Sequence, residues 1–471
     1  MKPTISRREL LKLAALSASS TILPSGCMNA GQSTRQGTRP NIVIIFLDDS
    51  GWSDFEPFGR HAYKTPNVEQ LAGEGCRFTN FYVPQAICSA SRAALLSGCY
   101  PCRTKVFGAH GPKDAGLNPK YAIMSEVFAA DGYRTAIFGK WHIGDQDGRR
   151  PWDRGFHESC GLLYSNDMWE HHPENPEYWG KYPLQYFENG LVKIPRVTQE
   201  DQSHLTTWYT EKAVDFIRRN KDNPFFLYVP HSMPHVPLFV SEKFAGKSGV
   251  GLYGDVMMEL DWSVGQINQS LKNNGIENHT FIVLTSDNGP WTSYGNHSGR
   301  TPFRQAKGTS FDGGVRSACW IKYPGMLRPG TVSDRIFCTV DLFPTLATIS
   351  GIPLPKNEID GRNVWEWISG NPSAVNPHDY YPFSTGSVFE GIISGDGRWK
   401  LHLPHAYRTL VEPGRDGSAG KYRQEKIGLS LFDMRHDPLE TTDVKDQYPE
   451  VLARLLAFAE HHRKQFYPRQ I

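Results

Sequence analysis

Residues 41–47 of this chain form one uninterrupted apolar run, Asn-Ile-Val-Ile-Ile-Phe-Leu, which stops abruptly at Asp48 and Asp49. The run lacks the polar alternation of a half-exposed strand and is typical of a strand buried on both faces of a sheet. A strand of that kind needs covering layers on both sides, which limits the folds open to the chain. Three later runs have a similar apolar character: residues 134–138, 225–229 and 281–285.

Segments with helical spacing lie between or beside these predicted strands. They are expected over residues 65–75, 126–130, 207–220 and 252–271. Strands that alternate with helices predict an α/β fold with a central, mainly parallel sheet flanked by helices. In open sheets of this type, ligand sites form beyond the carboxyl ends of the strands. Because all four predicted strands lead into polar residues, we expect those residues to converge in one cleft.

The pattern changes beyond residue 351. Residues 392–403, with Gly395-Asp396-Gly397 in the middle, predict a β-hairpin, and residues 448–462 predict a terminal helix. These features favour a smaller C-terminal α+β subdomain with an antiparallel sheet. The predicted division is a main domain at residues 40–352 and the subdomain at residues 353–471.

The charge of the chain argues against one class of partner. Of its 471 residues, 39% are hydrophobic and 21% are charged, which is an ordinary globular composition. The net charge is only +2, so no global field points to nucleic acid or to an anionic surface. We therefore expect no nucleic-acid partner.

The first thirty residues resemble an export signal rather than a part of the fold. Arg7-Arg8 precedes a short, mildly apolar stretch at residues 13–23, which is the pattern of a twin-arginine signal. This stretch is too short to cross a bilayer as a stable helix. We predict an export signal at residues 1–30, a linker at residues 31–39, and export from a bacterial cytoplasm to the periplasm or the exterior.

Two cysteine patterns leave alternatives open. Cys27 follows Leu-Pro-Ser-Gly, which loosely resembles a lipoprotein cleavage box, so lipid anchoring through Cys27 and simple cleavage nearby both fit. Cys99 and Cys102 have the spacing of a redox motif but lack the surrounding thioredoxin-like pattern. A local disulfide or two packed thiols therefore fits this pair better than redox catalysis.

Oxygen ligands follow two of the predicted strands. Asp48 and Asp49 end the first strand, and Asp287 and Asn288 end the last. Carboxylate and amide oxygens suit a hard cation such as Ca²⁺ or Mg²⁺, whereas zinc would prefer nitrogen or sulfur. The first pair alone could merely cap a turn, but a second pair at a matching strand end favours a metal site.

Cationic side chains accompany these ligands. Arg92, Lys140, His142 and Lys307 each lie beside glycine or small residues, so loops can bring them close to a ligand. Several positive groups around one metal indicate an anionic substrate, such as a transferred sulfuryl or phosphoryl group. His235 follows the third predicted strand and can protonate a leaving oxygen at neutral pH. Taken singly, each cation would be a solvated charge and the histidine would be structural.

Cys88 opens the segment Cys-Ser-Ala-Ser-Arg, four residues before Arg92, at the start of a run of small residues. Together with residues 132–142, Gly-Tyr-Arg-Thr-Ala-Ile-Phe-Gly-Lys-Trp-His, this segment resembles the two signatures of the type I sulfatases, in the alkaline-phosphatase superfamily. Residues 164–167 and 262–265 look most similar to the arylsulfatase A-like branch. The resemblance extends over residues 40–352 and resumes at residues 431–440. It implies an alkaline-phosphatase-like fold and the hydrolysis of sulfate esters.

The resemblance implies that Cys88 is oxidised to formylglycine, an aldehyde that hydrates to a geminal diol. One hydroxyl would attack sulfur to give a formylglycine-sulfate intermediate, and the other would lose its proton and expel inorganic sulfate. A formylglycine-generating maturation enzyme and the twin-arginine export machinery then become expected partners. The motif has Ala90 where proline is commonest, and maturation systems differ in accepting alanine there.

The other roles that the resemblance implies fall on residues already singled out above. One Ca²⁺ ion would be bound by Asp48, Asp49, Cys88, Asp287 and Asn288. Arg92 would steady the diol, and His142 would be the base for elimination. Sulfate would be held by Lys140, Ser165 and Lys307, while His235, with Lys307, would contact and assist the leaving alcohol.

The substrate is expected to be a sulfated carbohydrate or an aryl sulfate. Residues 164–187 are crowded with aromatic side chains that can stack on sugar rings, although the same loop could simply pack on itself. A phosphoester or phosphonate hydrolase of the same superfamily is a competing hypothesis. A non-catalytic sulfoglycan-binding protein, left unmodified at Cys88, is another.

Overall fold

The structure, a computed structural model, describes residues 39–468 of the chain. The predicted export signal and nearly all of the predicted linker lie outside the described residues, as does Cys27. The described part of the chain belongs to one compact unit, which begins at Arg39.

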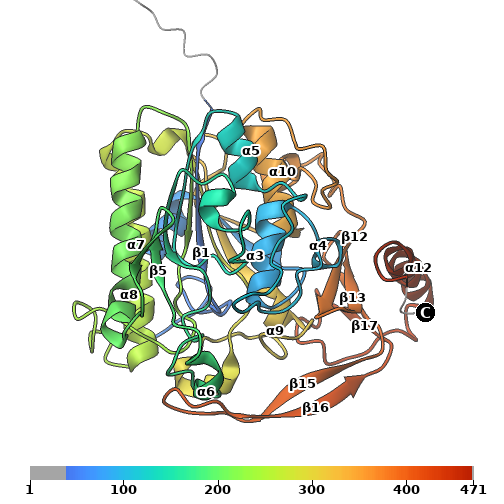
Figure 1. The fold of residues 1–471 in the computed structure, drawn as a ribbon. Helices are drawn as coiled ribbons and strands as arrows, with labels where there is room; N and C mark the ends of the chain where they lie inside the picture. Colours follow the sequence, from blue (N-terminus) through green and yellow to red (C-terminus); the bar gives the residue numbers. More distant parts are fainter. Residues whose placement is uncertain (1–38, 469–471) are drawn as a thin grey trace, which may run out of the picture. The chain divides into compact units, whose positions relative to one another are not determined.

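The centre of the fold is a large mixed sheet in the order β10-β2-β9-β8-β1-β7-β3-β4-β5-β6, with β11 paired to β2 (Figure 1). Strand β1 lies between β7 and β8 and runs parallel to both, and β3 is parallel to β7 and β4. The predicted mainly parallel α/β fold is therefore confirmed. The parallel strands are β1 (Asn41–Leu47), β3 (Arg134–Phe138), β4 (Glu158–Leu162), β7 (Phe225–Pro230) and β8 (Thr280–Ser286).

Both sides of the sheet carry strands that the apolar runs did not predict. Strand β9 is antiparallel to both β8 and β2, and β5 is antiparallel to β4 and β6. These strands mix polar with apolar residues, so their sequences lack the continuous hydrophobic signal of β1. They are β2 (Cys76–Tyr82), β5 (Tyr186–Glu188), β6 (Leu191–Ile194), β9 (Arg316–Lys322), β10 (Thr331–Ser333) and β11 (Phe337–Cys338).

Helices cover both faces of the sheet, as Figure 1 shows. Helices α2 (Pro66–Glu74), α7 (Gln199–Asn220) and α8 (Leu252–Asn273) lie on one face, while α3 (Cys88–Ser97), α5 (Met124–Ala130) and α10 (Thr339–Ile349) lie on the other. Side chains of β1 alternate between the two hydrophobic cores: Val43, Ile45 and Leu47 face one, and Ile42, Ile44 and Phe46 face the other. The two-sided burial explains why residues 41–47 contain no polar alternation.

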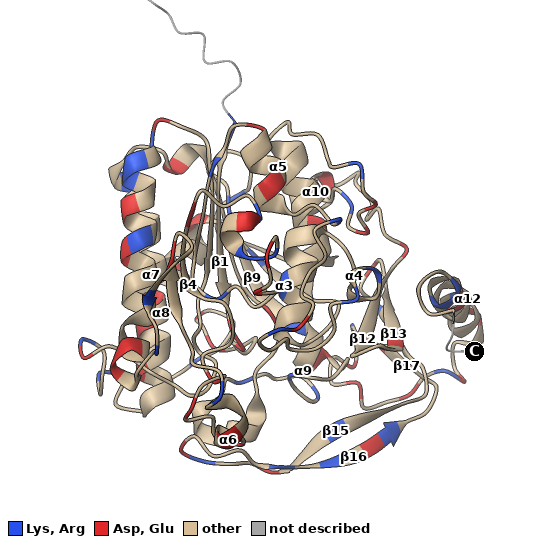
Figure 2. Ribbon diagram, in the orientation of Figure 1, with Lys and Arg blue, Asp and Glu red and all other residues tan. Residues whose placement is uncertain are grey.

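Helix α7 begins eight residues before the predicted start at residue 207. Thr198 caps its N-terminus by accepting a hydrogen bond from the backbone N–H of Asp201, whose carboxylate accepts one from the backbone N–H of Thr198. The outer surface of this helix carries acidic and basic residues along its length (Figure 2). Arg218 and Arg219 both pair with Asp215 there.

The C-terminal part contains a four-stranded antiparallel sheet, β12-β13-β14-β17, as predicted for this region. The hairpin expected around residue 396 is formed by β13 and β14. A separate two-stranded ribbon consists of β15 and β16. The elements are β12 (Tyr380–Thr385), β13 (Val388–Ser394), β14 (Trp399–His402), β15 (His405–Glu412), β16 (Lys421–Ile427), β17 (Ser430–Asp433) and α12 (Pro449–Phe466).

This small sheet shares a hydrophobic core with the main sheet, because Tyr82 and Val315 pack in the same cluster as Ile392 and Leu431. A boundary at residues 352/353 stays a prediction. Short helices complete the described chain: α4 (Pro101–Thr104), α6 (Pro176–Trp179), α9 (Asp312–Val315), α11 (Trp365–Ile368), and the 3-10 turns η1 (Pro151–Asp153), η2 (Glu277–His279) and η3 (Thr292–His297). Among residues 39–468, no helix has the length and apolar character needed to cross a membrane.

Cys99 and Cys102 are both buried free thiols, so the structure has two packed thiols at this motif rather than a local disulfide. The remaining cysteines of the described chain are likewise free and buried.

Truncation of one central side chain tests this packing. Leu227 on β7 is fully buried, so Leu227→Ala is expected to lower the free energy of unfolding by about 2–5 kcal/mol. Leu191 on the edge strand β6 is 64% exposed, so Leu191→Ala is expected to change it by less than about 0.5 kcal/mol. Urea unfolding followed by circular dichroism measures both, and equal effects would contradict the two-sided burial of the sheet.

Candidate active site

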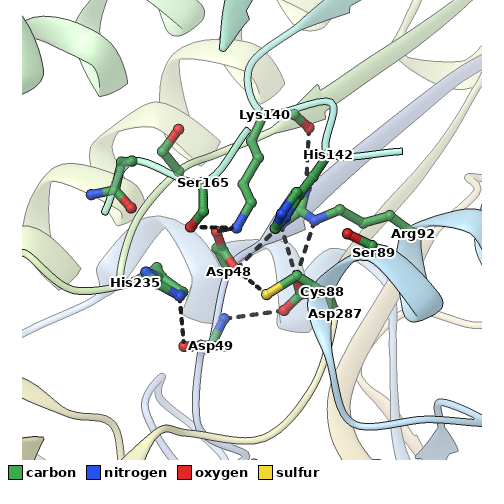
Figure 3. A network of polar contacts seen from close by, with 12 residues as sticks. Asp48, Asp49, Cys88, Ser89, Arg92, Lys140, His142, Ser165, His235 and Asp287 are labelled. Atoms are coloured by element: carbon green, nitrogen blue, oxygen red, sulfur yellow. Dashed lines mark hydrogen bonds and ion pairs between the residues drawn. The ribbon is translucent and has the colours of Figure 1, made fainter. Parts of the chain in front are cut away.

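The sequence-predicted site residues come together at the carboxyl ends of the central strands (Figure 3). Asp48 and Asp49 follow β1, Lys140 and His142 follow β3, His235 follows β7, and Asp287 and Asn288 follow β8. Cys88 and Arg92 face them from the first turns of α3, and Ser165 comes from the loop after β4. All of these side chains are buried, as is Lys307.

Asp48 binds two of the cations. Its carboxylate accepts a hydrogen bond from Lys140 Nζ at 2.5 Å, and Arg92 Nη2 lies 3.4 Å from Oδ1. Burial alone would raise the pKa of Asp48, but Lys140, His235 and Arg92 hold this pKa well below its usual range. Asp48 is therefore an anion at neutral pH even though it is completely buried.

Asp49 lies at the centre of a second group of contacts. Its Oδ2 accepts from Lys307 Nζ at 2.7 Å and lies 3.5 Å from His235 Nε2, while Oδ1 accepts from Asn288 Nδ2 at 2.7 Å. The backbone of Asp49 has a φ of 65°, in the left-handed region that few residues other than glycine adopt. This conformation turns the chain directly after β1, so that consecutive carboxylates enter the same site.

Asp287 pairs with Arg92, whose Nη2 and Nε donate to Oδ2 at 2.9 and 3.1 Å. Its Oδ1 accepts from the backbone N–H of Asp49 at 3.1 Å, which ties the end of β8 to the end of β1. Burial and the charge of Asp48 raise the pKa of Asp287 to about 7 against the opposing effect of Arg92. At Asp287, burial and the neighbouring carboxylate of Asp48 thus outweigh the pairing with Arg92, so its pKa is higher than that of Asp48.

Cys88 lies between the two groups. Its Sγ is 3.4 Å from Asp48 Oδ1 and 3.5 Å from Lys307 Nζ. Burial raises the pKa of this thiol well above its ordinary value, although Lys140 and Lys307 oppose that shift. The unmodified thiol is consequently protonated at neutral pH and is a poor nucleophile.

Lys140 reaches the site because the preceding residue is glycine. A Cβ at Gly139 would lie 1.9 Å from the carbonyl oxygen of Pro230, and that close approach lets the backbone N–H of Lys140 donate to the same oxygen at 2.7 Å. Lys140 Nζ also donates to Ser165 Oγ at 3.0 Å. Ser165, identified from the resemblance alone, is thus adjacent to the cationic cluster.

The surroundings of His142 keep its imidazole neutral, so this side chain can accept a proton. Burial, Lys140 and Arg92 lower the pKa of His142 well below its usual range. Its Nε2 lies 2.9 Å from the carbonyl oxygen of His110, which can only accept, so Nε2 carries the proton. Its buried Nδ1 has no hydrogen-bond partner among the described residues and is the free acceptor atom.

The oxygen-rich end of this cluster suits a cation. The ligand atoms of Asp48, Asp49, Cys88 and His235 all lie within 4.8 Å of one another. The buried Oδ1 of Asn288 has no hydrogen-bond partner within residues 39–468. A buried amide oxygen without a donor is costly, and a hard cation is a group that such an oxygen would bind.

Two residues of the site were not predicted from the sequence. The ring of Trp291 contacts Lys307 Nζ, 4.4 Å from its centroid, and its centroid lies 5.4 Å from that of His235. Arg408 on β15 donates to the backbone carbonyl of Lys307 at 2.8 Å. Trp291 could have been noticed because it closely follows Asn288, whereas Arg408 lies in a segment without any motif.

The aromatic loop at residues 164–187 is only partly available to a ligand. Trp169 is buried and packs against His171 and Phe239, so it is part of the protein interior. Trp179 stacks on His172, and Tyr178 is 46% exposed. Trp169 is therefore part of the packing of this loop, whereas Tyr178 lies on the surface.

An α/β scaffold that brings carboxylates, cations and a cysteine together at its strand ends defines a hydrolase of anionic esters. Residues 40–352 match the family model described as Sulfatase, and the chain belongs to that family of sulfate ester hydrolases.

Arylsulfatase A of Homo sapiens is 34% identical over 448 residues, covering 88% of this chain and 86% of that protein. N-acetylgalactosamine-6-sulfatase of Mus musculus is 32% identical and covers 92% of this chain and 87% of that protein. Among solved structures, the PsFucS1 sulfatase from Pseudoalteromonas sp. superimposes with a TM-score of 0.82 at 26% identity, covering 92% of each chain. These relatives favour neither the phosphoester nor the non-catalytic alternative.

A histidine beside the site gives a pH-dependent prediction. His231 follows β7 but contacts Ser263 of α8 at 3.1 Å, and burial lowers the pKa of His231 to about 3. Because the unfolded chain binds a proton near pH 6.5 and the folded chain does not, stability is lost as the pH falls below that value. At pH 5 this histidine is expected to cost about 2 kcal/mol of unfolding free energy.

The loss of stability between pH 7.5 and pH 5 is therefore expected to be smaller in His231→Gln than in the wild type by that amount. Urea unfolding at the two pH values measures it. His171→Gln, at an exposed position, serves as the matched control. The same pH-dependent loss in wild type and His231→Gln would show that the histidine is not kept neutral by burial.

Proposed function

We propose that this sulfatase acts on a carbohydrate sulfate ester, with Ca²⁺ and a formylglycine formed from Cys88. The observation that carries the proposal is the position of Cys88 Sγ between the carboxylate of Asp48 and the ammonium group of Lys307, beside three further candidate ligands that directly follow β1 and β8. One relative is named N-acetylgalactosamine-6-sulfatase, which supports a sugar as the alcohol that carries the sulfate. Another is named arylsulfatase A, so aryl sulfates are also suitable test substrates.

The charges of the site support the metal. When all three are ionised, Asp48, Asp49 and Asp287 balance Arg92, Lys140 and Lys307, but burial and the charge of Asp48 oppose the ionisation of Asp287. A bound cation would favour the ionised form of Asp287. Ca²⁺ held by the three carboxylates, Asn288 and the modified residue 88 would make the site positive. It would supply Lewis-acid polarisation of a sulfate oxygen.

Formylglycine would supply the nucleophilic oxygen that the neutral thiol of Cys88 lacks. Arg92 is placed to hold that group, because its guanidinium is fixed by Asp287 and by the carbonyl oxygen of Lys140. Lys140, Ser165 and Lys307 are the donors for the sulfate oxygens. Their fixed positions would stabilise the transition state, because preorganised donors need no rearrangement as negative charge develops on the sulfate oxygens.

Two histidines have separate roles in proton transfer. His142 is proposed as the base, with Nδ1 as the atom that accepts the proton, since Nε2 is committed to the carbonyl oxygen of His110. On the opposite side, His235 and Lys307 share Asp49 Oδ2 and are proposed to assist the leaving alcohol oxygen. The arrangement keeps the base and the leaving-group donor on different residues.

We also propose export by the twin-arginine route to the periplasm or the exterior, with lipid anchoring at Cys27 or cleavage near it as the alternatives. Twin-arginine transport carries folded proteins. Because Cys88 is only 1% exposed, its oxidation by the maturation enzyme would have to precede both folding and export.

The chemistry is tested by sulfate release measured on protein of known intact mass. Maturation is expected to remove one sulfur and two hydrogens from the thiol and add one oxygen. Matured protein should release sulfate from members of a panel of sulfated mono- and oligosaccharides and turn over an aryl sulfate faster than the matching aryl phosphate. Cys88→Ala is expected to lower turnover by about a thousandfold or more.

Cys160→Ala, which removes a buried thiol from β4, is the matched control and should keep most of the activity. Full activity in protein whose residue 88 is an unmodified thiol would contradict the proposed nucleophile. Release from aryl sulfate alone would contradict the carbohydrate substrate.

Metal removal is the second test. Chelation by EGTA is expected to lower both sulfate release and Tm, and added Ca²⁺ should restore both. At a hundredfold excess over Kd, bound Ca²⁺ would stabilise the fold by about 2.7 kcal/mol. The double variant Asp287→Ala, Asn288→Ala should lose the Ca²⁺-dependent rise in Tm, whereas Asp222→Asn at an exposed position should retain it. A Tm of the matured wild type that does not respond to Ca²⁺ would refute the metal assignment.

A further inference from the structure

Asp167 is a buried carboxylate that the catalytic scheme does not use. It lies two residues after Ser165, is 6% exposed, and its Oδ1 has no hydrogen-bond partner in the described part of the chain. Its Oδ2 has one neighbour of opposite character, His172 Nε2, at 3.7 Å. Because a buried carboxylate oxygen without a hydrogen-bond donor is costly, Oδ1 is expected to gain a donor when a ligand binds.

The surroundings place Asp167 on the leaving-group side of the site. Between it and Ser165, Asn166 donates to Gln202 Oε1 and to the carbonyl oxygen of Pro237, which anchors this loop on the segment that carries His235. Pro237 is two residues after His235, and Asp167 directly follows Asn166. The carboxylate is therefore near the group proposed to assist the leaving oxygen.

Trp291 supplies an apolar surface beside the same groups. Its ring contacts Lys307 and His235, as described above, and also Tyr294, with centroids 4.9 Å apart. Lys307 and His235 are buried, whereas Trp291 is only half-buried, so part of Trp291 reaches the surface beside these groups. Its buried Nε1 has no hydrogen-bond partner within residues 39–468.

We propose that Asp167 and Trp291 form the binding subsite for the sugar ring that bears the scissile sulfate, with Asp167 accepting hydrogen bonds from its hydroxyl groups and Trp291 packing against its C–H face. The inference rests on the proposed carbohydrate sulfatase function and specifies the substrate within it. An aryl alcohol has no hydroxyl groups to offer Asp167, so this carboxylate separates sugar sulfates from aryl sulfates.

The negative charge also discriminates among sugars. A second sulfate or a carboxylate beside the scissile ester would approach Asp167 as a like charge in a poorly hydrated site, which is unfavourable. Hydroxyl groups at the same place would satisfy Oδ1. The subsite therefore selects a sugar residue whose positions next to the scissile ester carry free hydroxyl groups.

The test compares two substrates in each variant, a sulfated monosaccharide that the wild type hydrolyses and an aryl sulfate. Asp167→Asn is expected to lower kcat/KM for the sugar about tenfold to a hundredfold more than for the aryl sulfate, since it removes charged hydrogen bonds. In the same variant, activity towards a sugar with a second sulfate next to the scissile ester should rise relative to the monosulfated sugar. Glu177→Gln, an exposed carboxylate on α6, is the control and should leave both ratios unchanged.

A purely structural role for Asp167 would lower kcat/KM for both substrates by the same factor, and that result would overturn the proposal. Trp291→Phe and Trp291→Ala provide a test that does not depend on the folding of Asp167→Asn. The Trp291→Phe variant should keep most of the preference for the sugar sulfate over the aryl sulfate, and the Trp291→Ala variant should lose it. Wild-type protein that hydrolyses aryl sulfate but no sugar sulfate would instead contradict the carbohydrate substrate, whatever the variants do.

Discussion

The site depends on three carboxylates buried together with three cations at the ends of β1, β3 and β8. Asp48 and Asp287 share Arg92, Asp48 binds Lys140, and Asp49 binds Lys307. Each of these ions would be strongly unfavourable in the interior by itself, so removal of any one leaves its partner uncompensated. The strand ends and α3 must therefore keep fixed relative positions, so that these ion pairs stay within hydrogen-bond distance. The helical layers packed on both faces of the sheet hold them there.

Much of this arrangement could be predicted because its signals are local. The unbroken apolar run of β1 indicated burial on both faces, and the polar residues after β1, β3 and β8 indicated one edge of a parallel sheet. The motif around Cys88 indicated the position now proposed for the nucleophile, and the family resemblance added Ser165 to the candidate residues. The predicted start of α7 was late because its first two turns are mostly polar and are stabilised by the Thr198 cap rather than by apolar spacing.

Other features arise from contacts between distant segments and leave no local pattern. Arg408 meets the backbone of Lys307 only because the β15–β16 ribbon packs against the segment of residues 293–307, which a hydrophobic period does not encode. Burial of Trp169 depends on Phe239, which is seventy residues away in sequence. The antiparallel strands β2 and β9 mix polar and apolar residues, so no continuous apolar run marks them, although β9 is buried along nearly its whole length.

The β15–β16 ribbon pairs only with itself yet contacts the site at two points. Arg408 holds the backbone of Lys307, and at the far end Gly414 and Gly420 donate to the carbonyl oxygen of Ser293, close to Trp291. The ribbon is also held by Tyr407, which is 6% exposed and packs against Phe311. A substitution in this one segment can therefore act at a distance, because it can shift Lys307 through Arg408 and the loop that carries Trp291 and Tyr294 through Ser293.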